Sequence, residues 1–325
     1  MDSAHNSNYF CIAGHHVCIQ FTETGTNSMD LLPSFSAFRL TGQEPSDLLF
    51  TLTVDDTLRP VKGRRLVRKF DTGNGDTLVY QLPDGGYQYI IRDIMDRDCC
   101  LLVCDKTFAN CQCALNGDWV MRSFGLNDAL MLIFAFAGSF QHTMLIHASC
   151  IALGDYGYPF IAKSGTGKST HSSLWLKHIE GCHLMNDDNP AIRIVDGQPF
   201  IYGTPWSGKT PCYRNIKARL GAITRIDRAP KNSIERLAPV EAFASLLPAC
   251  SSMKWDTTIY NNLCDDIARL IETTPVYTLH CLPDEEAALI CHATLTATVP
   301  DASASGSIPA TTPDASASGS TSAAQ

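Results

Sequence analysis

One stretch of the chain, from Phe160 to Thr170, combines the end of an apolar strand, a glycine-containing loop and the first turn of a helix. From Ala162 to Ser169 it fits the phosphate-binding loop pattern, with alanine where the strict pattern has glycine. Gly165 and Gly167 allow the backbone to curl so that successive N–H groups point inward. The alternative is a polar turn between a strand and a helix. Nucleotide binding is favoured because strand, loop and helix occur together, and because the helix dipole aims at the same point.

This loop predicts specific contacts with a bound nucleotide. Lys168 would reach the outer phosphates, and the hydroxyl of Ser169 would bind a magnesium ion, Mg2+. The residues expected to bind ATP are Lys163, Ser164, Gly165, Thr166, Gly167, Lys168, Ser169 and Thr170.

A second stretch, Gly203 to Thr210, fits the strict loop pattern better, but its context is wrong. Pro205 lies where the chain must curl around phosphate and has no N–H to donate. Pro211 follows directly, so no helix would begin there to face a phosphate group. We therefore interpret Gly203–Thr210 as a loop near the active site.

Two acidic residues, Asp187 and Asp188, follow a short apolar strand about twenty residues after Lys168. One carboxylate can hold magnesium and the other can accept a proton, as phosphoryl transfer requires. The alternative is a turn with two surface acids, since Asn189-Pro190 comes next. Arg214, further along, could stabilise the charge of a transferring phosphoryl group or be an ordinary solvated surface residue.

Composition excludes several classes of protein. The net charge of −8 over 325 residues argues against a nucleic-acid-binding protein. The 14 cysteines show no zinc or redox spacing, and beside a nucleotide loop they indicate a reducing cytoplasm. The N-terminus lacks a signal-peptide core. The most apolar run, Ala129 to Gly138, is too short to span a bilayer, so we expect no membrane partner and a buried helix over about Asn127–Thr143, capped by Asn127 or Asp128.

Three regions are expected along the chain. Residues 1–125 form a β-rich N-terminal domain, predicted to be an antiparallel meander with hairpins at Pro83–Gly86 and Gly73–Asp76. Residues 126–299 form an α/β domain with a mixed sheet, in which His147 lies inside a strand from Leu145 to Leu153. Residues 300–325 are rich in Ala, Ser and Pro and predict a disordered, dispensable tail.

Together these residues resemble the HPr kinase/phosphorylase-like branch of the ATP-dependent phosphoenolpyruvate carboxykinase superfamily. The resemblance covers about Leu145 to Leu295. It implies a mixed-sheet P-loop kinase domain of the carboxykinase type, with a functional histidine at His147. It also implies that Asp187 is the proton-transferring carboxylate and that Asp188, with Ser169, binds the metal.

The resulting hypothesis is a cytoplasmic, ATP-dependent kinase that transfers the γ-phosphate to a serine-type hydroxyl of a protein, a peptide or a small molecule. Its catalytic residues would be His147, Lys168, Asp187 and Arg214, with ATP and Mg2+ as cofactors. The rivals are a nucleotide-dependent carboxykinase-like lyase and a regulatory module that binds nucleotide without chemistry. The acceptor, any reverse phosphorylase activity, the role of the N-terminal domain and assembly into a homo-oligomer are left open by the sequence.

Overall fold

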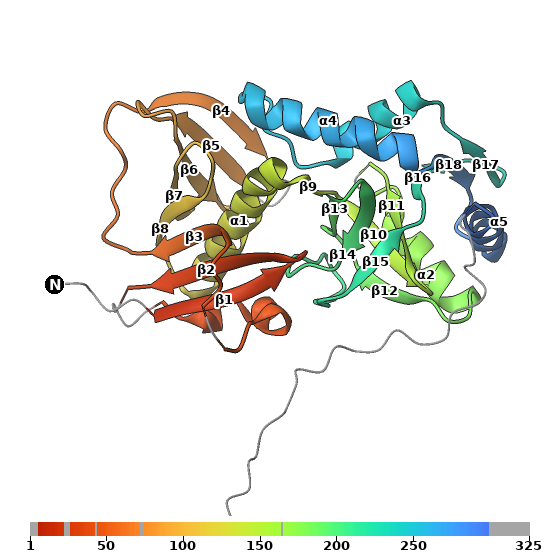
Figure 1. Cartoon of the computed structure of the whole chain (residues 1–325), viewed down its shortest axis with the longest axis horizontal. Coiled ribbons are helices and arrows are strands. Elements are labelled where there is room, and N and C mark those ends of the chain that lie inside the picture. Colours follow the sequence, from red (N-terminus) through yellow and green to blue (C-terminus); the bar gives the residue numbers. More distant parts are fainter. Residues whose placement is uncertain (1–5, 23–26, 43, 72–74, 164, 299–325) are drawn as a thin grey trace, which may run out of the picture.

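Two mixed β-sheets, each covered by helices, make up the described part of the chain (Figure 1). The computed structural model describes residues 6–22, 27–42, 44–71, 75–163 and 165–298. The fold is therefore mixed α/β, as the sequence predicts. Ser164, part of the Gly73–Asp76 turn and the predicted tail lie outside the described residues.

The N-terminal sheet has the strand order β1-β2-β3-β8-β7-β6-β5-β4. Strands β4 to β8 of this sheet form the expected antiparallel meander, and Leu82 and Gly86 close the hairpin between β5 and β6. The meander prediction is wrong for β3, which pairs parallel to both β2 and β8. The chain must cross over to make these pairs, and strand patterns do not reveal such crossovers. The strands are β1 (Asn6–Ile12), β2 (His15–Phe21), β3 (Leu48–Val54), β4 (Arg65–Asp71), β5 (Asp76–Gln81), β6 (Tyr87–Arg92), β7 (Asp98–Cys104) and β8 (Asn110–Leu115).

Helix α1 (Trp119–Gly138) packs on this first sheet, against β3, β7 and β8. It begins eight residues earlier than expected from Asn127, because the Asp118 side chain accepts a hydrogen bond from Met121 N–H and caps it. The expected domain boundary at residues 125/126 therefore falls within α1. By length and composition α1 could cross a membrane, but 56% of its apolar window is buried inside the protein. Burial against a sheet accounts for that apolar sequence.

The second sheet has the order β17-β18-β16-β11-β15-β14-β13-β9, with β10 paired to β11 and β12 paired to β10. The strand predicted from Leu145 to Leu153 is broken: β9 ends at Leu145 and β10 begins at Ala148, so His147 lies between them. The strands are β9 (Thr143–Leu145), β10 (Ala148–Leu153), β11 (Tyr156–Ile161), β12 (His183–Asn186), β13 (Ala191–Val195), β14 (Gln198–Tyr202), β15 (Lys217–Leu220), β16 (Ile223–Arg228), β17 (Ser233–Arg236) and β18 (Val276–Cys281).

Strand directions bring distant residues to one edge of this sheet. Strands β11, β16 and β18 run parallel, so their carboxyl ends meet there. Strand β10 is antiparallel to β11 and to β12 and places Ala148 opposite Ile161 and Cys150 opposite Asn186. His147, the loop after Ile161 and the acids after Asn186 therefore emerge at the same edge, where ligands of open α/β sheets commonly bind.

Four further helices cover the second sheet: α2 (Lys168–His178), α3 (Pro239–Leu246), α4 (Thr257–Thr273) and α5 (Glu285–Thr296). In Figure 1, α4 and α3 lie along one side of the second sheet, and α2 and α5 lie on the other side. One hydrophobic core spans the two halves, and in it Trp206 of the second half packs against Phe35 and Phe134 of the first. Two further cores lie within the second half.

Candidate functional site

Two glycines in the loop after β11 have backbone conformations that depend on glycine. Gly165 and Gly167 adopt positive φ angles of 76° and 125°, which side-chain-bearing residues rarely adopt. Gly167 occupies the cap position of α2 and offers no capping side chain, so the first N–H groups of the helix face the loop. Backbone N–H groups at a helix start that follows such glycines are the kind of group that binds phosphate.

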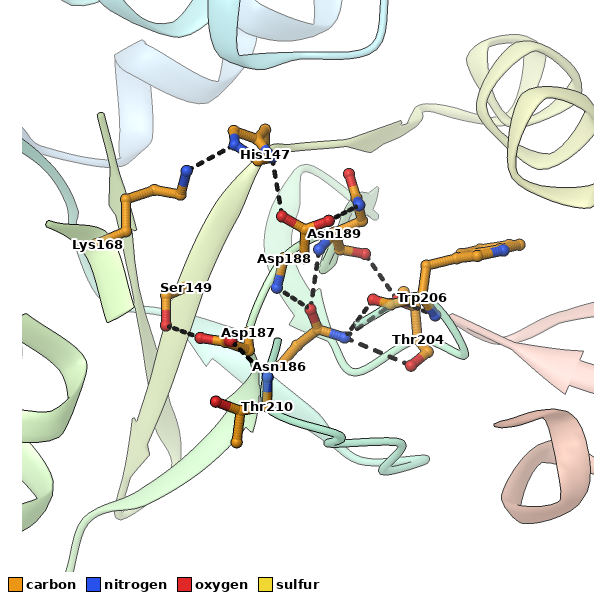
Figure 2. A network of polar contacts seen from close by, with 10 residues as sticks. All are labelled: His147, Ser149, Lys168, Asn186, Asp187, Asp188, Asn189, Thr204, Trp206 and Thr210. Carbon is orange, nitrogen blue, oxygen red and sulfur yellow. Dashed lines mark hydrogen bonds and ion pairs between the residues drawn. The ribbon is translucent and has the colours of Figure 1, made fainter. Parts of the chain in front are cut away.

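Lys168, His147 and Asp188 form a chain of contacts across the sheet edge (Figure 2). The Lys168 amine lies 2.6 Å from His147 Nε2, and His147 Nδ1 lies 3.0 Å from Asp188 Oδ1. An ammonium group only donates, so Nε2 accepts and Nδ1 carries the proton given to Asp188. Partial burial lowers the pKa of the Lys168 amine, and the negative charges of Asp188 and Asp187 oppose that shift.

The two aspartates sit in different surroundings. The Asp187 side chain accepts hydrogen bonds from Ser149 Oγ at 3.1 Å and from Thr210 N–H at 3.2 Å, and the residue is only 5% exposed. The Asp188 side chain is 30% exposed and also accepts a hydrogen bond from the Asn189 amide. The carboxylates are therefore distinct: one is held beneath a loop, and the other faces the histidine.

Asn186 explains how two adjacent acids can both reach this edge. Its side-chain oxygen accepts hydrogen bonds from the N–H groups of Asp188 and Asn189, which bends the chain at the end of β12. Its amide nitrogen donates to Thr204 and to the carbonyl of Trp206, so the turn is tied to the Gly203–Thr210 loop (Figure 2). The sequence shows Asn186 before the acids, but its side-chain contacts depend on tertiary structure.

The Gly203–Thr210 loop is not a second phosphate cradle in structure. No helix follows it, and the next element is β15. Trp206 is buried in the shared core and donates its indole N–H to Asn127 O. Gly208 lies close to both aspartates, since a Cβ there would come within 3.4 Å of Asp187 and 3.3 Å of Asp188. The interpretation of this stretch as a loop beside the site is confirmed, but no observation tests phosphate binding.

Arginine placement differs from what the sequence suggests. In the described structure, Arg214 is exposed, and its charge acts on His183 and Cys212; it makes no contact with the aspartates. Arg228, at the end of β16, instead donates to the carbonyls of Thr166 and Gly165 at 3.1 and 2.7 Å. No local sequence pattern indicates Arg228, because it lies 60 residues beyond Lys168 and only the parallel pairing of β16 with β11 brings it near the loop.

Two cavities border the glycine loop and share no lining residue. The first, of about 460 Å³, contains His147, Lys163 and Arg225 in its wall. The second, of about 420 Å³, is walled by Thr166, Gly167 and Thr170 of the loop and helix, by Arg228, and by the apolar chain after β18. The loop therefore has a charged cavity beside its first residues and a less polar one beside its last.

Ser169 and Asp188 are the residues at this edge that could supply oxygen ligands to a magnesium ion. Among the described residues, no group of three His, Cys, Asp or Glu side chains could hold a metal ion alone. Ser169 is exposed in the first turn of α2, and Asp188 offers a carboxylate at the same sheet edge. Magnesium is commonly held by one or two such oxygen ligands together with substrate phosphates.

Comparison with known proteins gives little further support. No protein-family model and no curated protein matches the chain. Among solved structures, the chain is similar to the HPr(Ser) kinase/phosphatase from Coxiella burnetii, with 11% sequence identity and a TM-score of 0.28. The match covers 47% of this chain and 93% of that one. A similarity this distant carries no argument about function, which must therefore rest on the site itself.

Proposed function

We propose that this protein is an ATP-dependent phosphotransferase that transfers the γ-phosphate to a hydroxyl group. The observation that carries the proposal is the contact chain Lys168–His147–Asp188 at the mouth of a glycine loop with two positive φ angles. A loop of this kind holds phosphate, and the lysine and carboxylate supply the charges that phosphoryl transfer needs.

Each group has a role in this proposal. The loop from Lys163 to Thr170 holds the phosphates, and Lys168 turns from His147 to the outer phosphates of ATP. Ser169 and Asp188 hold Mg2+, which would neutralise phosphate charge, and His147 orients Asp188 through its Nδ1–H. The less polar cavity beside Thr170 is of a suitable kind for the nucleoside, because such sites combine apolar walls with a few polar groups.

In the reaction, the acceptor oxygen forms a bond to the γ-phosphorus while the bond from that phosphorus to the bridging oxygen breaks. ADP leaves with the electron pair, and the acceptor hydroxyl proton passes to Asp187. Because Asp187 is nearly buried below Thr210, the Gly203–Thr210 loop must move for an acceptor to reach it.

Nucleotide binding is tested by calorimetry with magnesium-ATP on two lysine variants. Lys168→Ala should abolish binding, because it removes the charge at the outer phosphates. Lys209→Ala is the matched control: Lys209 is the corresponding lysine of the second loop pattern and is exposed, so binding should be unchanged. The reverse order would contradict the proposal.

Chemistry is tested separately from binding. Incubation with γ-labelled ATP and fractions of cell extract should transfer label to an acceptor without release of CO2. A purely regulatory module would transfer no label, and a carboxykinase-like lyase would transfer label only with decarboxylation of its acceptor. Binding of ATP without its consumption would favour the regulatory module. The cytoplasmic location expected from cysteine usage belongs to the same proposal.

A further inference from the structure

We propose that the charged cavity beside the glycine loop binds the carboxylate of a small hydroxy acid, which is the phosphate acceptor. This inference rests on the proposed function, since it names the class of acceptor for that site. The cavity holds about 460 Å³, which suits a small molecule rather than a folded protein surface. Its polar wall consists mainly of Arg225, Asp227, Lys163, Ser245 and His147.

Arg225 is held in place as a carboxylate receptor would be. It lies on β16 opposite Ile161, the last residue of β11, and therefore at the edge that carries the glycine loop. Its Nη1 donates to Ser245 Oγ at 2.9 Å and its Nη2 donates to Asp227 Oδ2 at 2.8 Å. These contacts fix the plane of the guanidinium, and a fixed planar fork matches a carboxylate better than a flexible cation does.

The Arg225 guanidinium retains unused donors. A guanidinium has five N–H groups, and the two described hydrogen bonds use only two of them. Its Nε is buried and has no partner in the described structure. The side chain is nevertheless 37% exposed, so part of the group remains accessible at the cavity wall. An arginine whose side chain is fixed in position but still has free N–H donors is suited to bind an anion.

The charges in the wall also favour an anion. Asp227 neutralises one positive charge through its ion pair with Arg225 at 2.8 Å. Lys163 adds a second positive charge, and its side-chain amine makes no hydrogen bond or ion pair among the described residues. The sum over Arg225, Lys163 and Asp227 is therefore positive, and a carboxylate entering the cavity would be attracted.

The position of His147 links this cavity to the proposed chemistry. Its ring is part of the cavity wall and also contacts Lys168 and Asp188. The backbone N–H of His147 donates to Ala249 O at 2.7 Å, which ties the residue to the chain after α3 on the same wall. A small hydroxy acid held by Arg225 would thus direct its hydroxyl past His147 toward the aspartates and the transferred phosphate.

The test measures thermal stabilisation by lactate, glycerate and 3-hydroxypropionate on the full chain without nucleotide, with glycerol and matched sodium chloride as controls. A ligand that binds the folded state raises the melting temperature. At least one hydroxy acid should raise it, and glycerol should not. Arg225→Met, which keeps the apolar part of the side chain but removes the guanidinium, should weaken the affinity for that hydroxy acid by roughly tenfold to a hundredfold.

Arg236→Met is the matched control, since Arg236 is an exposed arginine on β17 and does not line the cavity; it should respond as the unaltered protein does. The inference would be overturned if none of the three acids stabilised the protein, if glycerol did so equally, or if Arg225→Met retained the full effect. Because these measurements use no nucleotide, failure of magnesium-ATP binding would count against the proposed function alone.

Discussion

At the scale of single residues, the two adjacent aspartates should have separable roles. Asp188→Asn should weaken magnesium-ATP binding, because it removes a charged metal ligand. Asp187→Asn should leave binding nearly intact and lower turnover by about a hundredfold to ten-thousandfold, because it removes the proton acceptor. Calorimetry and single-turnover transfer of labelled phosphate measure the two effects separately.

The control for this pair is Asp196→Asn, which removes a carboxylate from the exposed β13–β14 turn and leaves Asp187, Asp188 and the charged cavity in place. It should change neither the affinity for magnesium-ATP nor the single-turnover transfer of labelled phosphate. If Asp187→Asn and Asp188→Asn lost affinity equally and transfer on bound ATP were unchanged, the assignment of Asp187 as the base would be wrong.

His147 supports a second prediction at this scale. If its Nδ1–H orients Asp188, His147→Asn, which can still donate near Nδ1, should retain more of the magnesium-ATP affinity than His147→Ala. Competition between Mg2+ and Mn2+ measures the change at the metal directly, and a residue needed only for packing would leave that competition unaltered. Equal metal affinity in both variants would contradict the orienting role.

Much of the residue-level site was predictable, and the exceptions have a common cause. Lys168, Asp187 and Asp188 were found because they belong to local patterns of strand, loop and helix. Arg225 and Arg228 were not found, since only strand pairing brings them to the loop. Arg214 was selected for its charge alone, and the described structure shows it in no contact with the aspartates; its catalytic role stays a prediction.

At the scale of elements, turns are set by residue type more directly than strand pairing is. The β13–β14 hairpin turns at Asp196-Gly197, where both residues have positive φ angles, as their residue types favour. The break between β9 and β10 was missed, because an apolar run from Leu145 to Leu153 does not show which residues pair. His147 therefore lies at a strand junction rather than within a strand.

Helix α1 carries an acid whose titration should affect stability. Asp128 is partly buried, its carboxylate has no hydrogen bond or ion pair among the described residues, and burial raises its pKa to about 7. The folded state thus binds a proton more tightly than the unfolded state, whose carboxyl group titrates at about 3.9. Stability from this group is fully present below about pH 4 and falls as the pH rises to about 7.

Asp128→Asn should remove this pH dependence. The variant should melt higher than the unaltered protein at about pH 8, where the buried charge is costly, and nearly equally at about pH 4. Asp196→Asn in the exposed β13–β14 turn is the control and should leave the profile unchanged. Thermal unfolding, followed by circular dichroism between about pH 4 and pH 8, measures this effect. If the melting temperature of Asp128→Asn changed with pH as that of the unaltered protein does, the prediction would be wrong.

At the scale of the whole molecule, sequence patterns indicated two kinds of structure but not how they join. The mixed sheet and the β-rich first half both appear, yet α1 belongs to the first sheet although a boundary was expected within it. Trp206 belongs to the Gly203–Thr210 stretch, and no local pattern indicates its partners. In the structure it packs at the joint between the two halves. Its ring centroid lies 5.9 Å from that of Phe35 and 5.3 Å from that of Phe134. Contacts of this range have no local signature in the sequence.

The contacts at this joint predict that both halves unfold together. Tyr87 Oη of the first half donates to Asp256 Oδ2 of the second at 2.8 Å, and the other Asp256 oxygen caps α4 through Ile259 N–H. Tyr87→Phe should therefore lower the free energy of unfolding by about 1.5–3 kcal/mol, the usual worth of a hydrogen bond to a charged group. Asp256→Ala should cost more, since it also removes a helix cap worth about 1 kcal/mol.

A double-mutant cycle between Tyr87 and Asp256, measured by urea unfolding, isolates the contact between the halves. The double variant should lose less than the sum of the two single losses, because the hydrogen bond is lost only once. Tyr213→Phe, at an exposed tyrosine, should lose no measurable free energy of unfolding.

Circular dichroism and tryptophan fluorescence should give one coincident transition in each protein, because the core containing Phe134 and Trp206 spans both halves. Two separate transitions, or additive losses in the cycle, would show that the halves are stable independently and that the joint contributes little.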